Sequence, residues 1–150
     1  MAYITTDQLS QRLGATLYAR LTDRVDGTTA DAGVAQQIIN DAEAEADGHL
    51  ARRYQTPVDL AAHPELASVL AARVLDLAEY GAWKSSPFVS AAPQRVHLLY
   101  AAALQWLGEV ARGQLVLPAA SPPSSTTAAD DVPHYSSAPR VFTADELDGL

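Results

Sequence analysis

The sequence contains no cysteine, which excludes disulfide bonds and thiolate metal ligands. Aromatic residues make up only 7% of the chain, and alanine dominates its hydrophobic content. Small side chains bury little area each, so we expect a thin, helix-rich core. No apolar run approaches the roughly 20 residues that cross a bilayer, and the first residues do not resemble a signal peptide. We therefore expect no membrane contact and a protein that acts inside the cell that makes it.

Positive charge is also scarce. Ten basic residues, of which only Lys84 is a lysine, face eighteen acidic ones and give a formal charge of −8. Affinity for a duplex grows with the number of phosphates that lysine and arginine neutralise. The composition therefore argues against tight or specific DNA binding. An acidic surface can still serve a channel in which DNA must slide without sticking.

The apolar residues recur at helical spacing. They predict one or two short helices over Thr5–Leu21, divided at Gly14, and longer helices over Ala30–Tyr54, Pro64–Lys84 and Ala91–Arg112. The pair Thr56-Pro57 should stop the second helix, because a residue before proline avoids the α region. In the third helix, Val69 is expected to share the buried face. Residues 1–117 are thus predicted to form an all-α domain, a small bundle of four to five helices.

Beyond residue 117 the composition changes. Residues 118–139 are rich in serine, threonine and proline, lack periodicity, and read as a flexible linker. Apolar residues return in residues 140–150, so the fold class includes an extended C-terminal arm. The docking candidates in this segment are Arg140, Val141, Phe142, Leu147 and Leu150. A short apolar motif on a tether is typical of docking to a partner. The alternative is a frayed tail without a role.

Sequence motifs for catalysis are missing. The four histidines, His49, His63, His97 and His134, show no spacing that is typical of a metal site. There is no glycine-rich phosphate loop and no nucleophile elbow, so we predict no catalytic residue, no metal and no cofactor. Asp41 and Glu45 could be read as the paired carboxylates of a helical hydrolase. Charges of this kind usually form a solvated helix face, and this reading ranks last.

Two structural roles are conceivable for each of four residues, Arg52, Arg53, Trp106 and Gly48. Arg52 and Arg53 can satisfy the last carbonyls of the second helix or reach an acidic neighbouring subunit, with Tyr54 packing in the core. Trp106 lies at the edge of the apolar stripe of its helix. It could pack against the core at the rim of the bundle, or it could serve as an anchor in an interface with a partner. An interior glycine usually reflects close packing, and we expect that at Gly48 rather than a subunit contact.

Several segments together resemble one family. The run Asp47-Gly48-His49-Leu50-Ala51-Arg52-Arg53-Tyr54 with Pro57-Val58 resembles the signature of Mu-like phage head–tail connector proteins. The opening Tyr3-Ile4-Thr5-Thr6-Asp7-Gln8-Leu9, the helix from Pro64 with Leu66, Asp76 and Tyr80, and the ending Arg140-Val141-Phe142-Thr143-Ala144-Asp145-Glu146-Leu147-Asp148-Gly149-Leu150 are similar to further family segments. The long linker over residues 118–139 departs from the family pattern and leaves the reach of the terminal motif open.

The resemblance implies a virion structural protein, made in the host cytoplasm and located in the virion neck. Such connectors form a ring, usually dodecameric, below the portal protein. They extend the DNA channel and dock the stopper or tail-terminator protein, while genomic DNA passes without specific binding. The terminal segment is expected to insert into the portal or an adjacent subunit, and the isolated chain to be largely monomeric. The alternative is a small acidic regulatory or antitoxin-like binding module.

Overall fold

The computed structural model describes residues 2–117, which contain five α-helices and no strand. The helices are α1 (Thr6–Leu13), α2 (Ala15–Thr22), α3 (Ala32–Leu50), α4 (Pro64–Ser85) and α5 (Gln94–Arg112). The predicted all-α bundle is confirmed. Within residues 2–117, no helix combines the length and apolar character needed to cross a membrane. The predicted linker and arm, residues 118–150, lie outside the described part of the chain.

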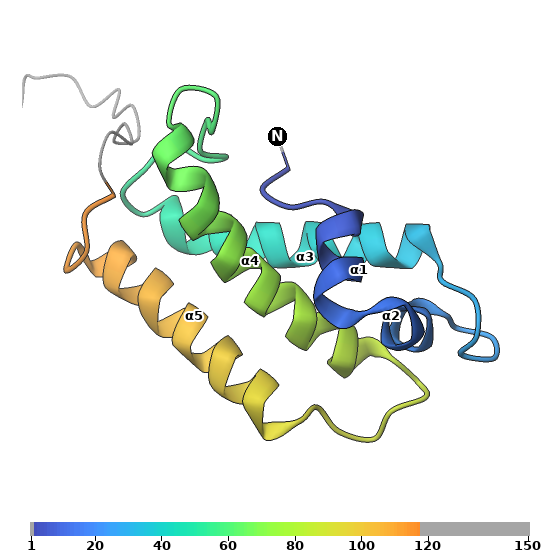
Figure 1. Cartoon of the computed structure of the whole chain (residues 1–150). Helices are drawn as coiled ribbons and strands as arrows, with labels where there is room; N and C mark the ends of the chain where they lie inside the picture. The colour runs from blue at the N-terminus through green and yellow to red at the C-terminus, as the bar shows by residue number, and fades with distance from the viewer. Residues whose placement is uncertain (1, 118–150) are drawn as a thin grey trace, which may run out of the picture.

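The three long helices form the body of the molecule. Helix α4 packs against both α3 and α5, and α3 also contacts α5 (Figure 1). The short helices α1 and α2 pack against α3 and α4 (Figure 1). The largest side chains with almost no exposure include Ile4, Leu9, Leu21, Ile39, Leu50, Leu70 and Leu107. The core therefore joins the opening segment to all three long helices.

Local chemistry explains where the first helices begin and end. Thr5 caps α1: its hydroxyl accepts from the Gln8 N–H at 3.2 Å, and the Gln8 side chain accepts from the Thr5 N–H at 2.9 Å. Gly14 then adopts φ +79°, a conformation that few other residues tolerate, and separates α1 from α2. The predicted division at Gly14 is confirmed.

Helix α3 ends earlier than the predicted Tyr54. Its N-terminus is capped by Asp31, whose carboxylate accepts from the Gly33 and Val34 N–H groups. At the other end, the Arg53 and Tyr54 N–H groups both donate to the Leu50 carbonyl, so residues 51–54 form a turn. This turn directs Tyr54 back into the core, where it is 6% exposed.

Three other expectations from periodicity are wrong. Helix α5 begins at Gln94 rather than Ala91, because Pro93 stays extended at ψ 150° and Ala92 precedes a proline. Val69 is 39% exposed, since it lies at the edge of the stripe that α4 buries. Gly48 is exposed, and a Cβ built there meets no atom within 4 Å. Close helix packing therefore does not explain this glycine.

Tyr3 joins the opening segment to the end of α3. Its hydroxyl donates to Asp47 Oδ1 at 2.5 Å and accepts from the Val58 N–H at 2.8 Å. Burial and the bond to Asp47 raise the pKa of Tyr3 well above its usual range. Burial also raises the pKa of Asp47, and the bond from Tyr3 counteracts part of that rise. Two segments that carry the family resemblance, the opening segment with Tyr3 and the segment with Asp47 and Val58, are thus in contact in the structure.

Asp23 organises the loop between α2 and α3. Its carboxylate accepts from the N–H groups of Val25 at 2.8 Å, Thr28 at 3.0 Å and Thr29 at 3.0 Å. The backbone bonds from Thr29 and Val25 hold the pKa of Asp23 well below its usual range. The loop is therefore held by an ionised carboxylate.

This depressed pKa predicts acid sensitivity. The stabilisation is fully present above the unfolded-state pKa of about 3.9 and is lost as pH falls from there toward the lower folded-state pKa. We expect Asp23→Asn to lower the melting temperature at pH 7 and to flatten its decline between about pH 4 and pH 2. Melting curves across this range, with Asp7→Asn as the exposed control, test it. A decline as steep in Asp23→Asn as in the unmodified chain would contradict the assignment.

Candidate functional site

The chain leaves the described body beside the turn that follows α3. The Leu117 N–H donates to the Tyr54 hydroxyl at 2.9 Å, and Leu117 is 5% exposed. Tyr54 therefore packs as a core residue, as predicted, and also fixes the position from which residues 118–150 depart. The sequence could not pair these two residues, because they lie 63 positions apart.

Three exposed arginines belong to the two helix ends near this exit point. The Arg53 guanidinium lies against Gly113, where an added Cβ would clash with Nη1. Gly113 ends α5 in the left-handed conformation at φ +76°, so glycine suits this position for two reasons. Arg52 and Arg112 are the chain neighbours of Arg53 and Gly113, respectively. We call Arg52, Arg53 and Arg112 the arginine pole.

Trp106 lies half-buried on α5 and packs against the core. The Arg73 guanidinium lies over its ring, with 5.9 Å from Cζ to the ring centroid, a cation–π distance. Both residues line a hollow of about 240 Å³ with Gln105 and Glu109. Trp106 therefore packs against the core at the rim of the bundle. Its role as an interface anchor stays a prediction.

A larger hollow of about 380 Å³ lies between α3, α4 and α5. We call it the α3–α5 hollow. Its apolar wall consists of Ile38, Ala42, Leu77 and Gly81, and its polar residues include Asp41, Glu45, Lys84 and Tyr100. The Tyr100 hydroxyl donates to Glu45 at 3.0 Å, and Gln37 donates to Asp41 at 2.7 Å. The two carboxylates of the hydrolase reading therefore lie beside an apolar hollow on the surface.

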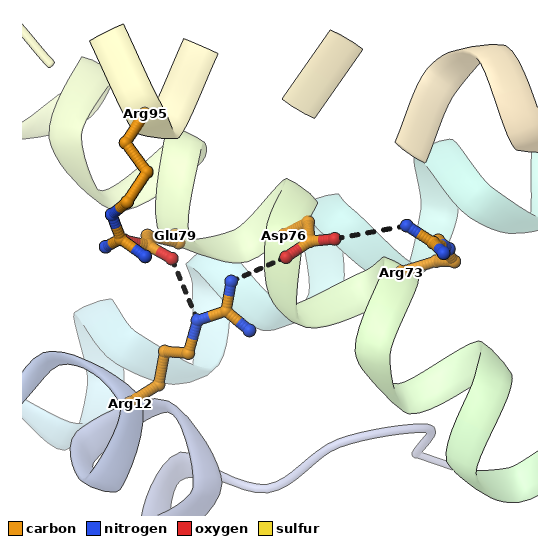
Figure 2. Close-up of polar contacts among 5 residues, drawn as sticks. All are labelled: Arg12, Arg73, Asp76, Glu79 and Arg95. Atoms are coloured by element: carbon orange, nitrogen blue, oxygen red, sulfur yellow. Dashed lines mark hydrogen bonds and ion pairs between the residues drawn. The ribbon is translucent and has the colours of Figure 1, made fainter. Parts of the chain in front are cut away.

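An ionic cluster of five residues, which the sequence reading did not identify, joins three helices (Figure 2). Arg12 of α1 donates to Asp76 at 2.6 Å and to Glu79 at 2.9 Å, both on α4. Arg95 at the start of α5 donates to Glu79 at 2.8 Å, and Arg73 lies 3.6 Å from Asp76. We call these residues the arginine–carboxylate cluster.

Burial makes this cluster energetically important. The side chains of Asp76 and Glu79 are only 7% and 2% exposed, whereas Arg95 is 68% exposed. Burial acts to lower the pKa of Arg12, but its bonds to Asp76 and Glu79 outweigh that effect and raise it. Two buried carboxylates thus depend mainly on Arg12. The sequence does contain a sign of this cluster, since the carboxylates Asp76 and Glu79 lie three residues apart on the apolar stripe of α4. The family resemblance drew attention to Asp76 alone.

Within the described residues, the histidines that the sequence suggested as candidates do not gather in one site. Among residues 2–117, no group of three or more histidine, aspartate or glutamate side chains is placed to hold a metal. His97 packs edge-on against Tyr80, with ring centroids 5.3 Å apart, and His63 lies 3.6 Å from Glu65. The docking candidates Arg140, Val141, Phe142, Leu147 and Leu150 lie outside the described residues, as does His134.

Comparison with known families decides the relationship. The family model described as "Bacteriophage Mu, Gp36" matches residues 3–134, most of the chain. The chain belongs to the bacteriophage Mu Gp36 family. It is therefore a Mu-like phage protein. The match begins at Tyr3 and covers Tyr54, Arg12 and the whole helical body. The comparison with curated proteins found no match.

Proposed function

We propose that this member of the Mu Gp36 family is a structural head–tail connector without enzymatic activity. It forms a ring, dodecameric in the virion, below the portal protein at the neck. The ring extends the DNA channel and docks the stopper or tail-terminator protein. The observation that carries the proposal is the family match over residues 3–134, together with the terminal motif quoted above.

The charge of the helical body supports this role. Residues through Leu117 include nine basic and thirteen acidic side chains, a difference of −4. Arg12, Arg73 and Arg95 are committed to buried carboxylates, and Arg20 and Arg24 donate to backbone carbonyls. Arg52, Arg53, Lys84 and Arg112 are the remaining basic residues of the body, and the excess of acidic side chains leaves a passing duplex little net attraction. This suits a channel that conducts DNA without binding it.

The connection at Tyr54 supports the docking role of the terminal segment. The described body ends at Leu117, and the first apolar residue of the segment 140–150, Val141, lies 24 positions later. If residues 118–139 form the linker that their composition predicts, a linker of this length would let the segment search a volume around the body before it binds. In the proposal, Phe142 and Leu147 enter the portal or a neighbouring subunit.

The direct test is a binding assay with the purified portal of the same phage. We expect the chain without residues 118–150 to lose most of its portal affinity while keeping its helical circular dichroism. We expect Phe142→Ala alone to cost about 2 kcal/mol, roughly thirtyfold in affinity, if Phe142 is a buried anchor. Ser124→Ala, in the predicted linker, is the matched control and should bind like the unmodified chain.

Imaging of the particle neck completes the test. We expect density for the chain directly below the portal in purified particles. Equal portal binding by the truncated chain would remove the docking role of the terminal segment. Absence of the chain from purified particles would reject the virion role. Co-purification with a basic cellular protein, without portal association, would favour the antitoxin-like alternative.

A further inference from the structure

The arginine pole lacks carboxylate partners within residues 2–117. All four arginine–carboxylate ion pairs in this part of the chain involve Arg12, Arg73 or Arg95. Among residues 2–117, the Arg112 side chain donates to the Gln114 side chain alone, at 3.3 Å. Two exposed apolar residues follow it, Leu115 at 37% and Val116 at 72% exposure. Within the described residues, this end of the molecule thus combines cations without carboxylate partners with exposed apolar side chains.

The α3–α5 hollow has complementary properties. Its wall is apolar and includes Gly81, where a Cβ would make only an ordinary contact with Ile38 Cγ2 at 3.6 Å. The exposed carboxylates Asp41 and Glu45 lie one helical turn apart on its α3 side, without an ion pair among the described residues. Among the described residues of its lining, Lys84 is the one cation, and it belongs to the α4 side.

We infer that the arginine pole of one copy docks at the α3–α5 hollow of the next copy. Leu115 and Val116 enter the apolar hollow, while Arg52 and Arg53 face Asp41 and Glu45. The occupant is a second copy of this chain, because the arginines of the pole match the carboxylates Asp41 and Glu45 in charge, and the neighbouring exposed residues Leu115 and Val116 match the apolar wall. This inference rests on the proposed ring and identifies its subunit contact.

The two surfaces lie at different places on the body. Tyr100 of the hollow and Arg112 of the pole are twelve residues apart on α5, about 18 Å at 1.5 Å per residue. A contact between them is head-to-tail, and such contacts produce rings when the rotation closes. Every copy then uses both surfaces, as a ring of identical subunits requires.

Disulfide trapping tests this contact cleanly, since the chain has no cysteine of its own. Val116→Cys and Lys84→Cys place thiols on the exposed pole and at the hollow. In oxidising conditions we expect dimers from a mixture of the two variants, little dimer from either alone, and a ladder from a full-length chain that carries both. Gln11→Cys, exposed on α1, is the control partner for Val116→Cys and should give only the random background yield.

Charge reversal provides the second arm. Arg52→Glu/Arg53→Glu in the Val116→Cys chain, or Asp41→Arg/Glu45→Arg in the Lys84→Cys chain, should each lower the mixed-dimer yield on the order of tenfold. Reversing both partners together should restore it. Yields with Lys84→Cys equal to those with Gln11→Cys, or no restoration by the double reversal, would overturn the inference.

The subunit contact and the connector role can be tested separately, because different results would contradict each of them. If the chain occupies the particle neck but the trapping yields match the background, the subunit contact is wrong and the connector role stands. If the chain is absent from particles, the connector role fails whatever the trapping shows. Melting temperatures of all variants, measured alongside, separate loss of contact from loss of fold.

Discussion

Arg12→Met is expected to destabilise the protein by about 3–5 kcal/mol, because it leaves two buried carboxylates without their main cation. Glu79 keeps Arg95 at 2.8 Å, and Asp76 keeps only Arg73 at 3.6 Å. These residual pairs place the expected loss toward the lower end of the range. Methionine preserves most of the side-chain volume, so the loss reports charge rather than a cavity. Urea unfolding followed by circular dichroism measures it.

Arg95→Met is the matched control for Arg12→Met. The Arg95 side chain is 68% exposed, and without it Glu79 still pairs with Arg12 at 2.9 Å, so Arg95→Met should cost less than Arg12→Met. A triple variant, Arg12→Met with Asp76→Leu and Glu79→Met, should recover most of the lost stability, since buried charges and partners are removed together. A loss in Arg12→Met no larger than in Arg95→Met would show that the cluster does not depend on Arg12.

Tyr54→Ala is expected to cost about 3–5 kcal/mol, through loss of a buried aromatic ring and the cavity left behind. Tyr54 is 6% exposed and belongs to the core formed by the long helices. The same change frees the Leu117 N–H, so the start of the terminal segment should loosen as well. Urea unfolding gives the stability, and amide hydrogen exchange at Leu117 reports the local effect.

Tyr54→Phe separates these two consequences. Phenylalanine keeps the ring but leaves the buried Leu117 N–H without an acceptor, at a cost of about 1–3 kcal/mol. We expect faster exchange at Leu117, with little change at Leu107 in the middle of the core. Unchanged exchange at Leu117 would mean that the hydroxyl does not hold the exit point in solution.

Helical periodicity located the long helices well, because each buries a stripe of apolar residues against the others. The helix boundaries that were predicted wrongly, the end of α3 and the start of α5, are explained by local structure. The turn over residues 51–54 carries Tyr54 into the core, and Pro93 delays α5 by three residues. Periodicity also placed Val69 on the buried face, since it reports spacing and not the width of the contact with a neighbour.

The candidate surfaces were only partly predictable. Arg52 and Arg53 were recognised as a helix-end cluster, but the contact of Arg53 with Gly113 depends on how α3 and α5 end together. Asp41 and Glu45 were recognised as charges on a helix face. The apolar hollow beside them is created by three helices, of which only one carries these carboxylates.

The sequence by itself determined the helical class, the division at Gly14, the change of composition after Leu117 and the family resemblance. Each depends on residues that are near one another in the chain or on short motifs. Only the tertiary structure decided that Arg12 neutralises Asp76 and Glu79, that Tyr3 and Tyr54 hold Val58 and Leu117, and that the arginine pole is unpaired within the described body. These contacts join residues about 55 to 67 positions apart, and their partners are selected by helix packing, which no local pattern encodes.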